Sequence, residues 1–421
     1  MFISAVLLSM LTVTTFTSCG DDEEDDIIVS PDNGNNGQQS PNIIVTVDAN
    51  GNAKGGHRFV KIDEANFYID DIKYTAVSGD LEVTGYDKAY FNGVARIISK
   101  LIYNGRTMKV VRIANDAFMS CSALTSVTFP ETLTSIGLRA FYGCKKLTDI
   151  TIPDNVTYLD EFAFGGTGLK SVYIGSGVKY ISTEAYSSFY CCYDINSIKV
   201  STSNLYYDSR YDCNAIIEKS TRKLILACNN TFIPEGVVSI AYYAFNGCTK
   251  GPLSVTIPNS MTSISHGAFR GYTALTSVTI PNSVKSIQDY AFYGCNKLTS
   301  ITIPDNVTSI GGEAFHGCSK MTSVIIGNGV KSLAMSAFIE CYSLSTITIG
   351  SGVTSMTGEN FSNCSRLADV YCYAQDVPLS SNVTFYKSSL SSATLHVPAG
   401  SISSYKESYP WNRFRSIVAI E

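Results

Sequence analysis

Cysteine and histidine supply most of the reactive side chains in this sequence of 421 residues, which holds 13 cysteines and 4 histidines. In an exported protein, so many thiols could form a disulfide framework, and cysteine combined with histidine could bind zinc. Their spacing indicates a different use. Eight cysteines follow an aromatic residue by three positions, in a pattern that recurs along the chain: Cys121, Cys144, Cys192, Cys248, Cys295, Cys318, Cys341 and Cys364.

A recurring position of this kind predicts one column of equivalent side chains. Stacked coils lie about 4.8 Å apart, and parallel side chains at that spacing hold their Cβ atoms too far apart for a disulfide. Thr167 and Tyr272 occupy the same position in two other repeats. We therefore expect the column to consist of buried cysteines that act as small apolar side chains. A disulfide bridge within the longer unit stays an alternative for the less regular cysteines: Cys191, Cys192, Cys213 and Cys228.

The histidines and acids do not form a catalytic pattern. A nucleophile needs a nearby base and an orienting group, but His266 and His316 occupy positions that other repeats fill with unrelated residues. Acids such as Asp154 and Asp305 lie in turns and offer no pair for glycoside hydrolysis. We expect no catalytic residue, no metal site and no cofactor, so the chain is predicted not to be an enzyme.

The composition limits the partners of the chain. Charged residues make up only 16% of it and the net charge is −5, so the sequence has no electrostatic footprint for nucleic acid. Serine, threonine, asparagine and tyrosine supply the polar surface instead. The polarity of the surface is therefore that of hydroxyl and amide groups, not of ions.

The first 19 residues contain an apolar stretch too short for a good membrane span and end in FTSC. This motif resembles the lipobox of bacterial lipoproteins, which implies cleavage before Cys19 and lipidation of its thiol. The next residues, GDDEEDD at 20–26, resemble the acidic export signal of surface lipoproteins in Gram-negative bacteria. Residues 1–19 are thus predicted to be a lipoprotein signal peptide and 20–42 an acidic, disordered tether. The chain would contact the membrane only through the lipid.

Ten aromatic residues mark a repeat with a period close to 23 residues. Self-similarity at a fixed period indicates a solenoid, in which each coil buries its apolar side against its neighbours. We expect a mainly β solenoid of the α/β leucine-rich repeat type, with about ten coils over residues 113–371 and a longer irregular unit at about 190–245. The marking residues are Phe118, Phe141, Phe164, Phe189, Phe245, Phe269, Phe292, Phe315, Phe338 and Phe361.

Each repeat contains the spacing L-x-x-I-x-I, as in Leu298, Ile301 and Ile303. Alternating β-branched residues predict a short strand with its apolar face inward. Pro304 follows the strand and ends it, because proline cannot donate a hydrogen bond to the ladder.

The sequence LTSITIPDNVTSIGGEAFHGC, residues 298–318, resembles the leucine-rich repeat of the BspA-like surface protein family. The resemblance covers about 113–371 and includes the longer unit. It implies adhesion to host matrix or plasma proteins, or to other cells. Together with the lipobox and the acidic run, this predicts a non-enzymatic, surface-exposed outer-membrane lipoprotein. Residues 43–112 alternate like β-strands and are predicted to form an N-terminal β-rich cap, and 372–421 resemble the C-terminal cap of such arrays.

Two columns of side chains are candidates for a binding surface. On the predicted strand face, small hydroxyl residues are the rule, and they suit an exposed strand without any ligand; examples are Thr279, Thr302 and Thr348. Bulky side chains, which are enriched at interface anchors, replace them at Tyr173, Ile325 and Tyr371. The second column lies in the turn after the repeat aromatic: Tyr142, Tyr293 and His316.

Three functions are compatible with these columns. Adhesion to proteins of the host or of neighbouring cells is the leading hypothesis. Glycan binding for nutrient capture, with tyrosines stacking on sugars, is the alternative, and a structural envelope protein is a third. Clustered tyrosines on one face would favour glycans, whereas a flat Thr/Ser ladder would favour proteins or a structural role.

Overall fold

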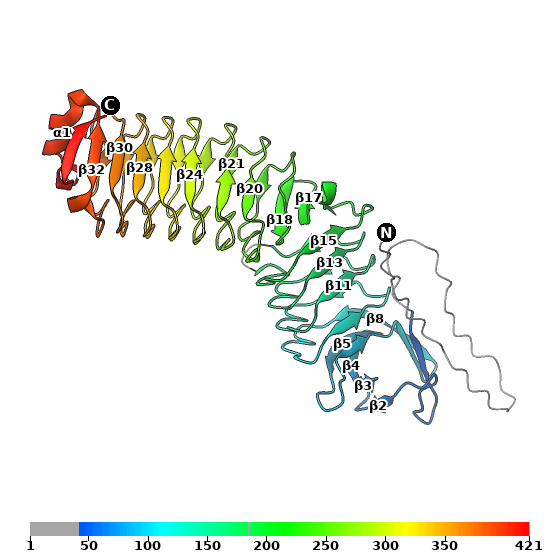
Figure 1. Cartoon of the computed structure of the whole chain (residues 1–421). Coiled ribbons are helices and arrows are strands. Elements are labelled where there is room, and N and C mark those ends of the chain that lie inside the picture. Colours follow the sequence, from blue (N-terminus) through cyan, green and yellow to red (C-terminus); the bar gives the residue numbers. More distant parts are fainter. Residues whose placement is uncertain (1–41, 184–185, 421) are drawn as a thin grey trace, which may run out of the picture. The chain divides into compact units, whose positions relative to one another are not determined.

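The computed structural model describes residues 42–183 and 186–420. The predicted signal peptide, Cys19 and nearly all of the acidic tether lie outside these residues. The described part confirms the predicted solenoid, with about 13 turns of about 23 residues. The number exceeds the predicted ten because both flanking regions contribute coils. Figure 1 shows successive coils of the solenoid lying side by side.

Each coil contributes two strands, which pair in parallel with the equivalent strands of the next coil. The first strand arises from the I-x-I alternation, and it builds what we call the long-strand ladder. Its buried residues alternate with exposed ones, as the pattern in Ser300–Ile303 shows. The ladder is formed by β11 (Asp149–Ile152), β13 (Ser171–Ile174) and β15 (Ser197–Val200), then β20 (Ser254–Thr256) and β22 (Ser277–Thr279), then β24 (Ser300–Ile303), β26 (Ser323–Ile326), β28 (Thr346–Ile349), β30 (Asp369–Cys372), β32 (Thr394–Val397) and β33 (Ser416–Ala419).

The second strand of each coil has only two residues, usually a serine followed by a buried aliphatic residue. We call the resulting column the short-strand ladder. It is formed by β10 (Ser135–Ile136), β12 (Tyr158–Leu159) and β14 (Tyr180–Ile181), then β21 (Ser263–Ile264), β23 (Ser286–Ile287), β25 (Ser309–Ile310), β27 (Ser332–Leu333), β29 (Ser355–Met356) and β31 (Leu379–Ser380).

A stack of phenylalanine rings runs through the core. Neighbouring rings lie nearly parallel, for example Phe315 and Phe338 with centroids 4.9 Å apart and an interplanar angle of 2°. The stack continues beyond the ten predicted positions to Phe385, whose ring lies 5.7 Å from that of Phe361. Trp411 is fully buried and meets Phe385 edge-on at 5.5 Å. The C-terminal region therefore contains a further coil, and Trp411 covers its end.

The N-terminal region is a sheet that continues into the solenoid. Its strand β8 pairs in parallel with β10, so that Ile113 lies opposite Ile136, and β6 pairs in parallel with β9. Both ladders thus begin on this region. Its strands are β1 (Ile44–Val47), β2 (Phe59–Lys61), β3 (Asn66–Ile69), β4 (Ile72–Val77), β5 (Asp80–Tyr86), β6 (Val94–Arg96), β7 (Lys100–Tyr103), β8 (Arg106–Ile113) and β9 (Ser126–Thr128).

The irregular unit replaces a plain coil with antiparallel strands. Strands β16 (Tyr207–Asp208), β17 (Ala215–Glu218) and β18 (Lys223–Ala227) pair antiparallel, and β18 then pairs in parallel with β19 (Ser239–Ile240). The single α-helix of the described residues, α1 (Ile402–Glu407), lies near the C-terminus. None of the helices in the described part is long and apolar enough to cross a bilayer.

Candidate functional site

The cysteine column is buried, and most of its thiols donate hydrogen bonds to backbone carbonyls of the preceding coil. The Cys144 thiol donates to the carbonyl oxygen of Phe118 in the preceding coil at 3.0 Å, and the same contact recurs at 3.1 to 3.8 Å for Cys192, Cys295, Cys318, Cys341 and Cys364. Burial raises the pKa of the Cys144 thiol to about 12. These six thiols tie coil to coil and pack as small buried side chains.

The four irregular cysteines are free thiols in the structure. Cys191 is half-buried, and the Tyr193 hydroxyl donates to its sulfur at 2.9 Å. This hydrogen bond, together with burial, raises the pKa of Tyr193 to about 12. Across the described residues, no group of three or more His, Cys, Asp or Glu side chains is placed to hold a metal ion.

The long-strand ladder brings several predicted surface residues into one line. Thr302 pairs with Ile325, Ile325 with Thr348, and Thr348 with Tyr371. Ile325 is 47% exposed, although its neighbours Val324 and Ile326 are buried. We call this line, Thr302 to Tyr371, the strand-face column. It presents one exposed aliphatic side chain between two threonines.

Tyr371 is less available than the sequence predicted. The imidazole of His396, one coil further on, stacks on its ring at 4.2 Å with an interplanar angle of 12°. His396 is held in place by Asp369, whose Oδ1 lies 3.0 Å from Nε2. The aromatic end of the column is therefore a Tyr371–His396 pair, which the sequence did not reveal because His396 lies outside the regular repeats.

Tyr173 belongs to another part of the ladder, where it lies between Thr151 and Lys199 in the sheet of β11, β13 and β15. Thr279 is exposed, pairs with Thr256 and lies one coil before Thr302 at the same repeat position, with the Thr299 N–H donating to the Thr276 carbonyl between the two coils. Five of the six predicted strand-face residues therefore follow one another from coil to coil, and Tyr173 lies apart from them.

The hydroxyl residues of a coil divide into two kinds. The threonine that directly follows the first buried leucine or methionine of a coil donates to the preceding coil, as Thr299 does to the Thr276 carbonyl at 3.2 Å and Thr322 to the Thr299 carbonyl at 3.1 Å. In the described part of the chain, the side chains of Thr302 and Thr348 make no hydrogen bond of this kind. The first hydroxyl column stabilises the stack, and the second is free for a partner.

The predicted turn column separates into two aromatic clusters. Tyr293 and His316 are ring neighbours at 4.6 Å. Tyr142 instead meets Phe162 edge-on at 6.3 Å, in a cluster with Tyr186 and Tyr190. All three predicted residues are half-buried, because their rings pack on side chains of adjacent coils.

A cation lies within the Tyr293 cluster. The Arg270 guanidinium carbon lies 4.0 Å from the Tyr293 ring centroid and 5.0 Å from that of Tyr290, within the range of cation–π attraction. His266 connects Tyr290 to Tyr242, with ring centroids 5.4 and 5.2 Å away. Sequence analysis missed this cluster because its members occupy different positions of the repeat, and only the stacking of coils brings them together.

His316 lies between two carboxylates. Its Nδ1 is 2.9 Å from Glu313 Oε2 and its Nε2 is 3.5 Å from Glu340 Oε2. Both imidazole nitrogens therefore face acceptors. This arrangement orients the ring against Tyr293 and explains a histidine at this position better than a catalytic role does.

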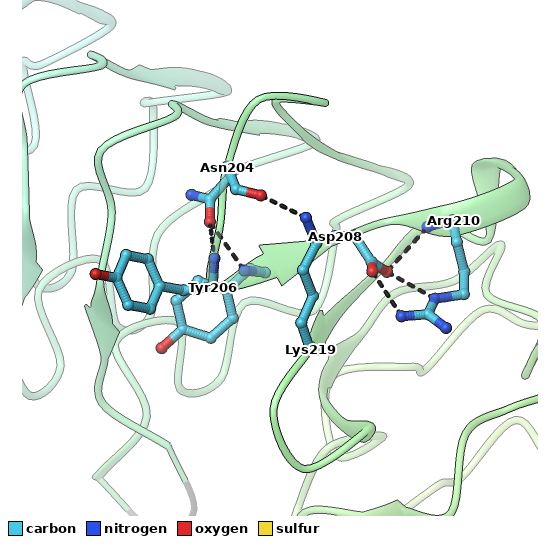
Figure 2. A network of polar contacts seen from close by, with 6 residues as sticks. Asn204, Tyr206, Asp208, Arg210 and Lys219 are labelled. Carbon is cyan, nitrogen blue, oxygen red and sulfur yellow. Dashed lines mark hydrogen bonds and ion pairs between the residues drawn. The ribbon is translucent and has the colours of Figure 1, made fainter.

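The irregular unit has buried aliphatic residues such as Ile216, Ile217 and Leu224 in place of stacked rings, and polar side chains join it to the neighbouring coil. Figure 2 shows Asn204 accepting hydrogen bonds from the backbone and Asp208 paired with Arg210. The Asn204 Oδ1 accepts from the backbone of Tyr206 and the next residue at 2.8 Å each, while its Nδ2 donates to two carbonyls of the preceding coil, those of Gly175 and Val178. Asp208 and Arg210 form a bidentate pair at 2.9 and 2.6 Å.

A family model for the BspA type leucine-rich repeat region (6 copies) matches residues 111–221, 216–311 and 285–406, which together form well over half of the chain. The chain belongs to the BspA type leucine-rich repeat family. The matched residues of this BspA-type chain include both surface columns and the irregular unit.

Solved structures with a TM-score of 0.5 or more share the fold of this chain. The pneumococcal vaccine antigen PcpA is 17% identical with a TM-score of 0.51, over 86% of this chain and 99% of PcpA. A leucine-rich repeat protein from Eubacterium ventriosum is 21% identical with a TM-score of 0.50, over 80% of this chain and 96% of that protein. A leucine-rich repeat protein from Bacteroides ovatus is 21% identical with a TM-score of 0.49, over 84% of this chain and 100% of that protein. Among curated proteins, none matches the chain.

Proposed function

We propose that this chain is a non-enzymatic surface protein that binds proteins of a host or of neighbouring cells through its strand-face column. The observation that carries the proposal is the register of the column. Parallel pairing places the 47% exposed Ile325 between Thr302 and Thr348 on consecutive strands. An exposed aliphatic group framed by free hydroxyls resembles an interface centre with a polar rim.

The family supports a binding role for the solenoid. Stacked repeats build extended surfaces that other solenoid proteins use for recognition. The environment of the thiols is consistent with this, because the column is buried and six of its thiols donate to backbone carbonyls of the preceding coil. Because these cysteines serve the stacking of coils, the solenoid is suited to binding.

The lipid anchor at Cys19 completes the proposal. Cleavage before Cys19 and lipidation of its thiol would place the acidic tether between an outer membrane and the solenoid. Incorporation of labelled palmitate by the wild type and its loss in Cys19→Ser would support the anchor. Digestion of the chain by protease added to intact cells would support exposure at the surface, and full protection would contradict it.

Adhesion tests the binding surface directly. Cells displaying the wild type should attach to at least one of three coated proteins, fibronectin, fibrinogen or mucin, and Ile325→Lys should abolish that attachment. Leu205→Lys is the matched control, because Leu205 is a 79% exposed aliphatic residue in the irregular unit. Equal attachment by Ile325→Lys and the wild type would refute the strand-face column as the site.

A further inference from the structure

An open groove of about 440 Å³ crosses the coils beside the short-strand ladder. Its floor includes the serines of β23, β25 and β27, namely Ser286, Ser309 and Ser332. They lie in one line, because Ser286 pairs with Ser309 and Ser309 with Ser332. Within the described residues, none of these hydroxyls takes part in a hydrogen bond, in contrast to Thr308, which donates to the Lys285 carbonyl at 3.1 Å.

Two side chains of the groove have fixed orientations and polar atoms that are free to form further hydrogen bonds. The backbone N–H of His266 donates to Gln288 Oε1 at 2.9 Å, and the N–H of Gly312 donates to Asp289 Oδ1 at 2.7 Å. These bonds fix both side chains. Gln288 Nε2 and Asp289 Oδ2 have no hydrogen-bond partner in the described part of the chain. The groove thus offers a fixed donor, a fixed acceptor and three hydroxyls that can act as either.

An imidazole ring borders one end of the groove. His266, which also lines the groove, is exposed and has its ring 5.2 Å from that of Tyr242. The Tyr242 ring lies against Gly267, where a Cβ atom would come within 1.9 Å of Tyr242 Cδ2. Only glycine permits this approach, and its φ of +56° is in the left-handed region as well. The local sequence therefore holds a ring surface directly beside the polar groove.

The balance of charge and the geometry select the class of ligand. Asp289 is the only carboxylate among the lining residues, and no Lys or Arg is among them, so neither a polyanion nor a polycation is matched. A ligand rich in hydroxyls can donate to Asp289 and accept from Gln288, and its C–H groups can lie on the rings. The serines recur at about 4.8 Å, which suits an extended polymer of small polar units.

We propose that this groove binds a neutral oligosaccharide that lies along the solenoid axis, with its terminal ring against His266, whose imidazole packs on Tyr242. The site is distinct from the strand-face column and does not rest on protein adhesion. Sugar hydroxyls meet Ser286, Ser309 and Ser332 in turn, one coil after another.

The experiment is calorimetric titration of the full chain with four probes: cellohexaose, xylohexaose, mannohexaose and maltohexaose. At least one should bind, and Ser309→Lys, which fills the floor of the groove, should weaken that binding by at least about tenfold. Ser135→Lys is the matched control, since Ser135 holds the same position in β10 outside the groove. His266→Ala should weaken binding to a smaller extent, and circular dichroism should show that every variant is folded.

Two results would overturn the site. Binding of none of the four probes, or equal weakening by Ser309→Lys and Ser135→Lys, would remove the groove as a sugar site. Tighter binding of polygalacturonate than of all four neutral probes would contradict a neutral ligand. Loss of sugar binding with adhesion intact would show that the groove and the strand-face column act separately.

Discussion

The regular coils from Phe269 to Phe361 and the irregular unit around Asn204 reach the same result by different means. In the regular coils, successive phenylalanine rings lie 4.9 to 5.4 Å apart at angles of 2 to 10°. In the irregular unit, one asparagine side chain makes four hydrogen bonds, two to carbonyls of the preceding coil and two to the backbone of the unit itself. Repeated rings stabilise the first region, whereas the second combines buried aliphatic residues with this polar junction.

This difference predicts where the chain tolerates change. A ring in the stack contacts a ring on each side, so its loss weakens two interfaces between neighbouring coils. The surface columns depend on that stacking, because the register of Ile325 with Thr302 and Thr348 is set by the coils beneath. The irregular unit can vary on its exposed side as long as Asn204 remains.

The largest expected effect is on the regular stack. Phe315→Ala removes a fully buried ring and should lower the free energy of unfolding by about 3 to 5 kcal/mol, as for other buried phenylalanines. Urea denaturation followed by circular dichroism measures this change. Phe232→Ala in the irregular unit is the control, since Phe232 is 49% exposed. A similar loss in both variants would contradict the role of the stack.

Asn204→Ala should have the next largest effect. It leaves buried carbonyl and N–H groups without partners and should cost about 2 kcal/mol of unfolding free energy. Asn204→Asp keeps the acceptor for the backbone of Tyr206 but puts a buried carboxylate oxygen against the carbonyls of Gly175 and Val178, so at neutral pH it should destabilise the chain at least as much as alanine does. An unchanged midpoint in Asn204→Ala would show that the antiparallel strands alone hold the unit.

The cysteine column predicts a loss of stability at alkaline pH. The Cys144 pKa is raised by burial from 9.0 to about 12, so the folded state binds a proton that the unfolded state releases as the pH passes 9.0. The contribution of the Cys144 thiol to the free energy of unfolding is complete below the pKa of the unfolded state. It is lost as the pH rises from that value toward the pKa of the folded state. Between about pH 8 and pH 10 the wild type should lose about 1 kcal/mol more than Cys144→Ala. Parallel pH profiles would contradict this assignment.

The smallest effect separates the two hydroxyl columns. Thr299→Val removes a bond to the Thr276 carbonyl and should cost about 1 kcal/mol, whereas Thr302→Val should cost nearly nothing. Thermal unfolding of the two variants measures the difference. Equal costs would mean that Thr302 also serves the stack, which would weaken its assignment to the binding surface.

The sequence predicted the solenoid and its core because the phenylalanine and cysteine positions repeat at one period. It predicted the line from Thr302 to Tyr371 for the same reason. It could not predict the stacking of His396 on Tyr371 or the Arg270 cluster, since those contacts join different repeat positions. The free hydroxyls of the short-strand ladder could not be predicted, because the sequence does not distinguish a serine whose hydroxyl is hydrogen-bonded from one whose hydroxyl is free.

Amide hydrogen exchange of the full chain, free and bound to whichever of fibronectin, fibrinogen or mucin it retains, tests the central claim most directly. The strand-face column predicts new protection centred on β24, β26 and β28, with Ile325→Lys preventing it and Leu205→Lys leaving it intact. Protection confined to the irregular unit or to the short-strand ladder would contradict the claim, and so would the absence of saturable binding to all three proteins.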